Sequence, residues 1–236
     1  MNMNSLLSVA LQMTEGGLPA GLSQEEMSEL ESAVTRQKVI EKGDILFRQG
    51  QPFKHLIALR SGSCKAYSTG GAGHDQVLGF FFPGDLLGLE AIHSNQYQYT
   101  VTALDTCSLC MLDYSRLLQL SSRLPELNKQ LLMTMSREMI PQTSIHLSSH
   151  ADERLASFLM SLSYRMRLRG FSSRTLYLNM TRQDIANHLG LTLETVSRTF
   201  KKLEVAGLIE ATRRQVIILD LRQLQVKACT AKKTMA

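Results

Sequence analysis

Apolar residues change their spacing along the chain, and the first regular pattern marks out a β-rich segment. From about residue 39 to residue 112, short apolar runs alternate with turns that contain glycine. Residues 44–50, 56–62 and 76–84 are three such runs, and the turn signals recur at intervals of roughly ten residues. Short strands at this spacing are typical of a small closed sandwich or barrel. The segment therefore predicts a compact β domain.

Helical periodicity appears on both sides of this β segment. Ser23 and Glu26 have the spacing of a capping box, which predicts the start of a helix. An apolar stripe at helical intervals follows: Met27, Leu30 and Val34. Further helices are predicted over residues 114–122 and 151–170. The second of these has a continuous apolar side: Leu155, Phe158, Leu159 and Leu162.

A longer helix is predicted from Pro125, because proline is favoured in the first turn of a helix. Its apolar side chains recur every four residues: Leu127, Leu131, Met135 and Met139. Such a stripe suits packing against a second copy of the same helix, and we expect it to form a dimer interface. A position on the core of its own domain is the alternative. Pro141 is expected to kink or end this helix.

Residues 181–202 predict two short helices around a tight turn. Thr181 and Asp184 have capping-box spacing, Gly190 stands where the turn needs positive φ, and Thr192 can cap the second helix. One face of that second helix is apolar: Val196, Phe200 and Leu203. Another face is polar: Glu194, Ser197, Arg198 and Lys201. Helix, turn and helix in this order are typical of a DNA-reading motif.

The polar face carries the groups that base recognition requires. We expect Arg198 to contact guanine, Glu194 to accept from cytosine or adenine, and Ser197 to contact thymine or its phosphate. A solvated face of an ordinary helical hairpin is the alternative. Residues 208–220 predict a β-hairpin wing with two arginines at its turn. Six residues are expected to contact the DNA backbone: Thr181, Thr192, Thr195, Lys201, Arg213 and Arg214.

Charge supports this interpretation, because it is distributed unevenly. Residues 151–236 hold 15 Lys and Arg against 7 Asp and Glu, whereas residues 1–150 hold 11 against 14. A basic C-terminal part is the electrostatic footprint of a protein that binds phosphates. The N-terminus has no basic leader, and no apolar stretch is long enough to span a bilayer. We therefore expect a cytoplasmic protein with double-stranded DNA as its partner, no membrane contact, and four reduced cysteines.

The predicted elements divide the 236 residues into four parts. These are an arm (1–22), a β domain (23–124), a dimerisation helix and hinge (125–150), and a DNA-binding domain (151–236). This order resembles the CRP/FNR family of dimeric transcription regulators. Five segments carry the resemblance, which is closest to the FNR branch: residues 47–50, 59–67, 82–88, 152–156 and 181–198.

The resemblance implies an α+β fold. Its parts are an N-terminal double-stranded β-roll like that of cyclic-nucleotide-binding domains, a long dimerisation helix and a C-terminal winged helix-turn-helix. It also implies a homodimer on a TTGAT-like, two-fold symmetric site, read by Glu194, Ser197 and Arg198. Leu193 replaces an arginine of the cyclic-AMP-receptor branch, so that branch's extra base contact is not expected. In activators of this family the loop matching residues 69–75 contacts RNA polymerase. Activation and repression both remain open.

Departures from the family pattern bear on cofactors. FNR proteins hold an iron–sulfur cluster with an N-terminal cysteine group, but residues 1–63 contain no cysteine, and Cys110 alone matches the β-roll position. We therefore expect no such cluster. Relatives that bind cyclic AMP meet its phosphate with an arginine, whereas none lies between Arg60 and Arg116. We expect no cyclic nucleotide either.

Haem and metal sites are the remaining possibilities. Some family members without cysteines sense nitric oxide or carbon monoxide through haem, and three histidines lie in or near the β segment: His55, His74 and His93. Haem therefore stays an alternative, although no cofactor is predicted. A cupin-type metalloenzyme would need His-x-His, which residues 39–112 lack, so we expect neither a metal site nor an enzyme. On a strand, Cys107 and Cys110 would lie roughly 10 Å apart, too far for a disulfide.

Overall fold

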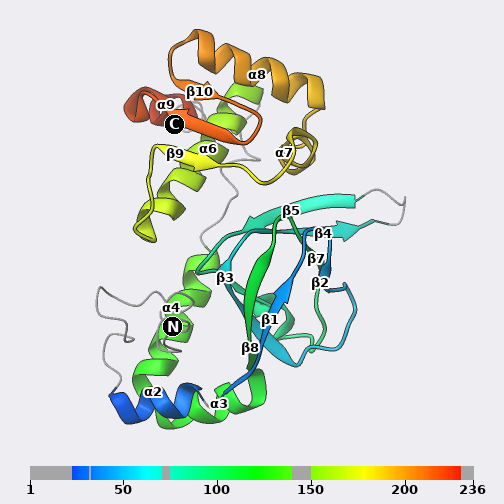
Figure 1. Ribbon diagram of the computed structural model, residues 1–236, viewed down its shortest axis with the longest axis vertical. Coiled ribbons are helices and arrows are strands. Elements are labelled where there is room, and N and C mark those ends of the chain that lie inside the picture. The colour runs from blue at the N-terminus through cyan, green and yellow to red at the C-terminus, as the bar shows by residue number, and fades with distance from the viewer. Residues whose placement is uncertain (1–22, 32, 71–74, 140–149, 230–236) are drawn as a thin grey trace, which may run out of the picture. The chain divides into compact units, whose positions relative to one another are not determined.

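The computed structural model describes residues 23–31, 33–70, 75–139 and 150–229. The chain divides into two compact units, Met1–Ile140 and Pro141–Ala236 (Figure 1). The predicted arm, the hinge with Pro141, and residues 71–74 of the predicted polymerase-contact loop lie outside the described residues. Among the described helices, none combines the length and the apolar character that crossing a membrane requires.

The N-terminal unit is built on two four-stranded antiparallel sheets. One sheet has the strand order β1-β8-β3-β6, and the other has the order β2-β7-β4-β5. Their side chains share one core, so the predicted β-roll is confirmed. The strands are β1 (Val34–Ile40), β2 (Ile45–Phe47), β3 (His55–Ser61), β4 (Cys64–Thr69), β5 (Asp75–Phe81), β6 (Leu86–Leu87), β7 (Thr100–Ala103) and β8 (Cys107–Asp113), with a short 3₁₀ helix, η1 (Leu89–Ala91).

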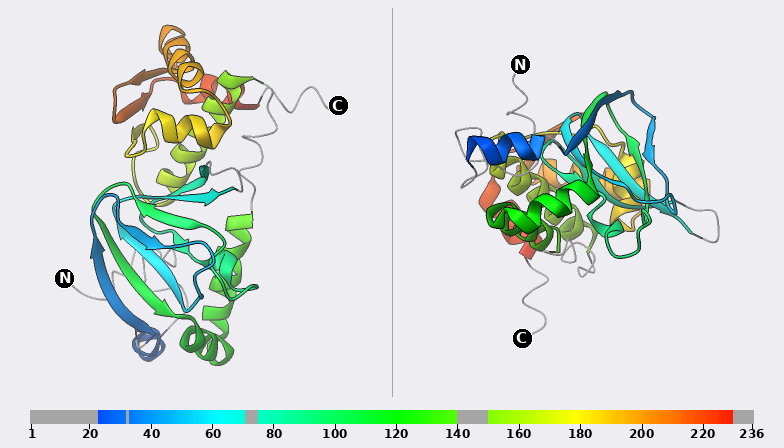
Figure 2. Two further views of the ribbon diagram at one scale, coloured as in Figure 1. Left: turned by 90° about the vertical axis from the view of Figure 1, so that its right-hand side faces the viewer. Right: turned by 90° about the horizontal axis from the view of Figure 1, so that it is seen from below.

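Three helices belong to this unit: α2 (Gln24–Glu31), α3 (Tyr114–Arg123) and α4 (Pro125–Met139). Figures 1 and 2 show α2 and α3 at one end of the roll and α4 along its side. The capping box before α2 is confirmed, because Ser23 N donates to Glu26 (2.6 Å) and Glu26 N donates to Ser23 Oγ (3.2 Å). Asp113 caps α3 by accepting from Arg116 N.

Two expectations about these helices need correction. Val34, assigned to the first helix, is the first residue of β1, because its partner on β8 is Leu112. On α4, Leu127 is fully buried in the core of the roll, and Leu131 packs partly against that core. Residues spaced by four drift around an α-helix by about 40° per step, so this stripe does not keep one face. Met135, further along the same spacing, is only partly buried.

The C-terminal unit is a helical domain with a small three-stranded sheet of order β10-β11-β9. Its elements are α6 (Ala151–Leu168), β9 (Thr175–Tyr177), α7 (Arg182–Leu189), α8 (Leu193–Val205), β10 (Ile209–Ala211), β11 (Gln215–Ile218) and α9 (Leu221–Cys229). The four apolar positions predicted for α6 are buried. The sequence interpretation missed α9, which packs on α6: Leu224 is fully buried, and Ser157 Oγ donates to Ala228 O.

Candidate DNA interface

The two predicted reading helices are present, and local hydrogen bonds fix their ends. At the start of α7, Asp184 N donates to Thr181 Oγ1 (3.0 Å), while Thr181 N donates to Asp184 Oδ2 (2.9 Å). This reciprocal pair is the predicted capping box. Gly190 ends the helix at φ 63°, a left-handed conformation that most other residues adopt only with strain. The chain can therefore turn sharply into the second helix.

The second helix, α8, separates its faces as the sequence predicted. Thr192 caps it, because its hydroxyl accepts from Thr195 N (3.2 Å). The apolar face is buried in the unit: Val196, Phe200 and Leu203. The polar face is exposed: Glu194, Ser197, Arg198 and Lys201. Burial of one face thus holds the other toward solvent, where a duplex can reach it.

Glu194 lies in the first turn of α8, beside the threonine that caps the helix. Its pKa is lowered by hydrogen bonds from its own backbone N–H and from the Thr192 hydroxyl, with a further contribution from nearby Arg198. An ionised carboxylate can only accept, so the Thr192 hydroxyl must donate to it. The Thr192 and Thr195 hydroxyl oxygens lie 3.0 Å apart. Either hydroxyl can donate in that pair.

The remaining predicted contacts on the two helices are partly engaged within the protein. The Ser197 hydroxyl donates to Leu193 O (2.9 Å), which leaves its oxygen as an acceptor. The Thr181 hydroxyl donates to Asp184 Oδ2 (2.7 Å). Lys201 makes an exposed ion pair with Glu204 (3.8 Å), an interaction of small energy. Lys201 can therefore exchange this partner for a phosphate at little cost.

The wing places both predicted arginines in solvent. Arg213 and Arg214 lie in the turn between β10 and β11, and both are exposed. The sequence interpretation missed Arg182, which joins the wing to the reading helices. Its guanidinium lies 3.5 Å from the centre of the Phe200 ring, and its Nη2 donates to Thr212 O (3.0 Å). Arg182 and Thr212 are 30 residues apart, so no local pattern announces this contact.

A second missed group joins three helices around Asp152. Its carboxylate accepts from Lys202 of α8 and lies 3.0 Å from the ammonium groups of both Lys202 and Lys227. Burial alone would raise the pKa of Asp152, but hydrogen bonds from the two lysines outweigh it and lower the pKa to about 2. Arg154 adds a bond from α6 to α7, because its Nη1 donates to Leu189 O. These contacts set the position of α8 in the unit.

Aromatic rings surround the buried carboxyl group of Glu90 in the β-roll. Tyr97 is buried, stacks on Phe47 at a centroid distance of 3.9 Å, and donates to His55 O. The Tyr99 hydroxyl donates to Glu90 (2.8 Å), and burial raises the pKa of Glu90. The other carboxylate oxygen of Glu90 is buried without a hydrogen-bond partner. An acidic group among rings is a poor setting for an anion.

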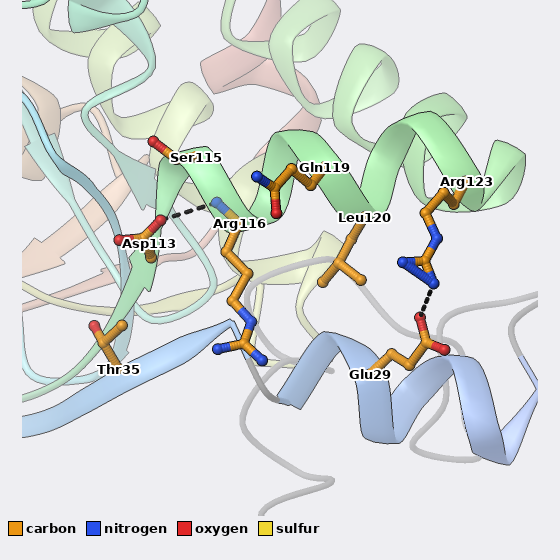
Figure 3. Close-up of a pocket in the computed structure, with 8 residues that line it drawn as sticks. All are labelled: Glu29, Thr35, Asp113, Ser115, Arg116, Gln119, Leu120 and Arg123. Atoms are coloured by element: carbon orange, nitrogen blue, oxygen red, sulfur yellow. Dashed lines mark hydrogen bonds and ion pairs between the residues drawn. The ribbon is translucent and has the colours of Figure 1, made fainter.

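A separate pocket of about 570 Å³ lies between α2, β1 and α3 (Figure 3). Arg123 forms an ion pair with Glu29 across the pocket (3.8 Å). The same helix, α3, also contributes Arg116 to the lining. The lining residues are Glu29, Thr35, Asp113, Ser115, Arg116, Gln119, Leu120 and Arg123. None of these residues is a histidine, cysteine or methionine, so this pocket offers no side chain suited to ligate haem iron.

Comparison with known proteins assigns a known domain to each of the two units. Residues 37–123 match the cyclic nucleotide-binding domain, and residues 153–226 match the Crp-like helix-turn-helix domain. The chain is 43% identical over 210 residues to the transcriptional activator protein anr of Pseudomonas aeruginosa, which covers 88% of this chain and 86% of that protein. It is 37% identical over 218 residues to electron transport regulator A of Shewanella oneidensis, covering 91% and 87%.

Solved structures show the same fold. The structure of FixK2 from Bradyrhizobium japonicum has a TM-score of 0.72 against this chain, at 24% identity, and the match covers 81% of this chain and 96% of that one. Relatives named as transcriptional activators and a helix-turn-helix domain make the protein a DNA-binding regulator rather than an enzyme. The chain belongs to the CRP/FNR family of transcription regulators.

Proposed function

We propose that this regulator is a cytoplasmic homodimer that reads a TTGAT-like, two-fold symmetric site. The observation that carries the proposal is the exposed face of α8, where Glu194, Ser197 and Arg198 stand clear of the core. Arg198 donates to guanine, Glu194 accepts from cytosine or adenine, and Ser197 contacts thymine or its phosphate. Half-sites about one helical turn apart, roughly 34 Å, suit two such helices.

Phosphate contacts come from groups at the edges of this face. The cations are Lys201 on α8 and Arg213 and Arg214 on the wing, all exposed. Thr181, Thr192 and Thr195 lie at the starts of α7 and α8, where backbone N–H groups also favour an anion. Such contacts position the protein without specifying sequence.

Dimerisation is proposed to use the outer side of α4. Leu132 and Met133 are adjacent and 59% and 53% exposed, which leaves both apolar side chains available to a second copy. Leu131 and Met135 of the predicted stripe are partly exposed beside them, and Met139 continues the spacing with a side chain outside the described residues. Leu127, buried in the roll, supports the interface only indirectly.

The proposal includes no iron–sulfur cluster and no cyclic AMP. A cluster of the FNR type needs four cysteine ligands, but Cys64, Cys107 and Cys110 are all fully buried in the β-roll core, and residues 1–63 supply none. The donor set does not fit. Haem stays the alternative: of its three candidate histidines, His55 is partly buried, His93 is exposed, and His74 lies outside the described residues. If the protein is an activator, RNA polymerase is a further partner.

The test is fluorescence anisotropy with protein purified in air and no ligand added. A symmetric TTGAT/ATCAA duplex is compared with a scrambled duplex across a salt series. Tight binding to the symmetric duplex alone supports the proposal, and it also means that no added effector is obligatory. Equal affinity for the two duplexes, with and without haem, contradicts the proposed operator.

The role of Arg198 is tested with Arg198→Ala. We expect a loss of roughly 1–3 kcal/mol on the symmetric duplex, about 5- to 150-fold in affinity, and little change on the scrambled one. Arg222→Ala removes an equally charged exposed side chain from α9 and serves as the matched control. Equal loss on both duplexes would show that Arg198 contacts the backbone and does not read a base.

A further inference from the structure

Two cysteines far apart in sequence meet inside the β-roll. Cys64 begins β4 and Cys107 begins β8, and these strands belong to different sheets. Their sulfur atoms lie 3.7 Å apart, and both residues are fully buried. Sequence spacing had drawn attention to Cys107 and Cys110, which share β8. The sulfur that Cys107 approaches instead comes from the opposite sheet.

Backbone atoms of residues 62 and 63 lie close to the Cys107 sulfur and limit its position. Leu104 N donates to Ser63 O (2.8 Å), and the Cys107 sulfur lies 3.3 Å from that same oxygen. Gly62 adds to the constraint, because a Cβ there would lie 2.6 Å from the Cys107 sulfur. Since a disulfide has an S–S length of about 2.05 Å, the sulfurs need to approach by roughly 1.7 Å.

We propose that Cys64 and Cys107 form an oxidisable dithiol whose substrate is a small peroxide, and that its product is a disulfide joining the two sheets. The Cys107 sulfur attacks a peroxide oxygen, the O–O bond breaks, and Cys107 becomes a sulfenic acid with release of water. The Cys64 sulfur then displaces the hydroxyl group as a second water. Two thiols lose two electrons and two protons in total, and one hydrogen peroxide becomes two waters.

The surroundings distinguish the two roles. Cys107 directly follows the exposed residues Asp105 and Thr106, and a hydrogen bond from the Cys64 thiol lowers its pKa, so Cys107 is the sulfur placed to act as the nucleophile. The same bond and burial raise the pKa of Cys64, which therefore stays protonated until the second step. Because Asp105 and Thr106 are exposed, this turn is the side from which a small oxidant would reach the pair. Neither step depends on DNA binding.

Cys110 provides an internal control. It lies on the same strand as Cys107 and is equally buried, and burial raises its pKa. Its neighbour on β3 is Ala58, which offers no sulfur. General oxidation of buried thiols would modify Cys110 as readily as Cys107, whereas a specific dithiol would spare it.

The experiment starts with fully reduced full-length protein, kept under argon and exposed to equimolar hydrogen peroxide. Remaining thiols are alkylated after denaturation, and the digest is mapped by mass spectrometry. We expect one cross-linked peptide pair, Cys64 to Cys107, lighter by two hydrogens and reversed by dithiothreitol. Cys110 and Cys229 should be alkylated in the same sample. Alkylation of Cys64 and Cys107 in full, or cross-links shared equally with Cys110, would overturn the proposal.

Variants separate the two steps. Cys64→Ser removes the second thiol, so Cys107 should accumulate as a sulfenic acid that dimedone traps. Cys110→Ser should form the disulfide at the wild-type rate, with an unchanged circular dichroism spectrum. If Cys64→Ser does not fold, the cross-link map of Cys110→Ser still decides, because a specific pair must form there. Loss of the cross-link in folded Cys110→Ser would contradict the assignment.

Discussion

The carboxylate of Glu194 is engaged by hydrogen bonds from its own backbone N–H and from Thr192 in the absence of DNA. The Thr192 hydroxyl is in turn hydrogen-bonded to that of Thr195, with 3.0 Å between the two oxygens. A side chain fixed in this way loses little rotamer freedom when it meets a base, so more of the contact energy appears as discrimination. At the scale of single residues, specificity therefore depends on threonines that read no base themselves.

This dependence predicts the effect of Thr195→Val. The substitution keeps the branched shape but removes the hydroxyl that is hydrogen-bonded to Thr192, so discrimination at the base read by Glu194 should fall by a few fold. Thr195→Ser, which keeps the hydroxyl, should behave as wild type. Anisotropy on duplexes altered at that base measures both. A loss that is uniform on all duplexes would mean that Thr195 acts only through its proposed phosphate contact and does not support Glu194.

At the scale of elements, the Asp152 group predicts a pH dependence of stability. The pKa of Asp152 in the folded unit is about 2, below its ordinary value of 3.8, because Lys202 and Lys227 outweigh the effect of burial. Since the folded-state pKa is the lower one, the stabilisation is present above about pH 4 and is lost as pH falls toward 2. Solvent screening at the exposed Lys202 limits it to about 1 kcal/mol.

Calorimetry of Asp152→Asn against wild type across this pH range measures the effect. The two melting temperatures should differ at pH 7 and converge near pH 2. Glu210→Gln neutralises a carboxylate exposed on β10 of the same unit and should show no such convergence. A constant difference between wild type and Asp152→Asn would assign the effect to packing rather than to charge.

The outer side of α4 predicts which substitution separates the subunits. Leu132→Glu places a charge at a residue that is 59% exposed in the single chain, so it leaves the core intact and destabilises only an interface. Light scattering after gel filtration should show the monomer mass. Leu118→Glu changes a similarly exposed leucine on α3 and should leave the dimer. If Leu118→Glu alone dissociates the dimer, the interface lies on α3 and not on α4.

The same elements show what the sequence could predict. Capping boxes at Ser23 and Thr181, the turn at Gly190 and the faces of α8 depend on residues within a few positions of one another, and all were predicted correctly. Contacts between distant segments were not. Helical spacing placed Val34 in a helix, but pairing with Leu112 makes it a strand residue. In the same way, the contacts of Arg182 with Thr212 and of Cys64 with Cys107 join residues that only the folded sheets bring together.

At the scale of the whole molecule, the uneven charge predicts how binding responds to salt. Residues 151–236 carry 15 basic against 7 acidic residues, but Lys202 and Lys227 are engaged with Asp152. The proposed phosphate contacts, Lys201, Arg213 and Arg214, give six cations in a dimer. The logarithm of affinity should then fall with the logarithm of salt concentration with a slope of about −5.

Replacing both wing arginines tests this count. Arg213→Gln together with Arg214→Gln removes four of the six cations from a dimer, so the slope should shrink to about −2. Affinity should fall by a similar factor on symmetric and scrambled duplexes, because phosphate contacts carry no sequence information. Arg198→Ala should show the opposite pattern, with lost discrimination and a nearly unchanged slope. If the wing variant keeps the wild-type slope, the wing is solvated in the complex, and other cations of the basic unit contact the phosphates.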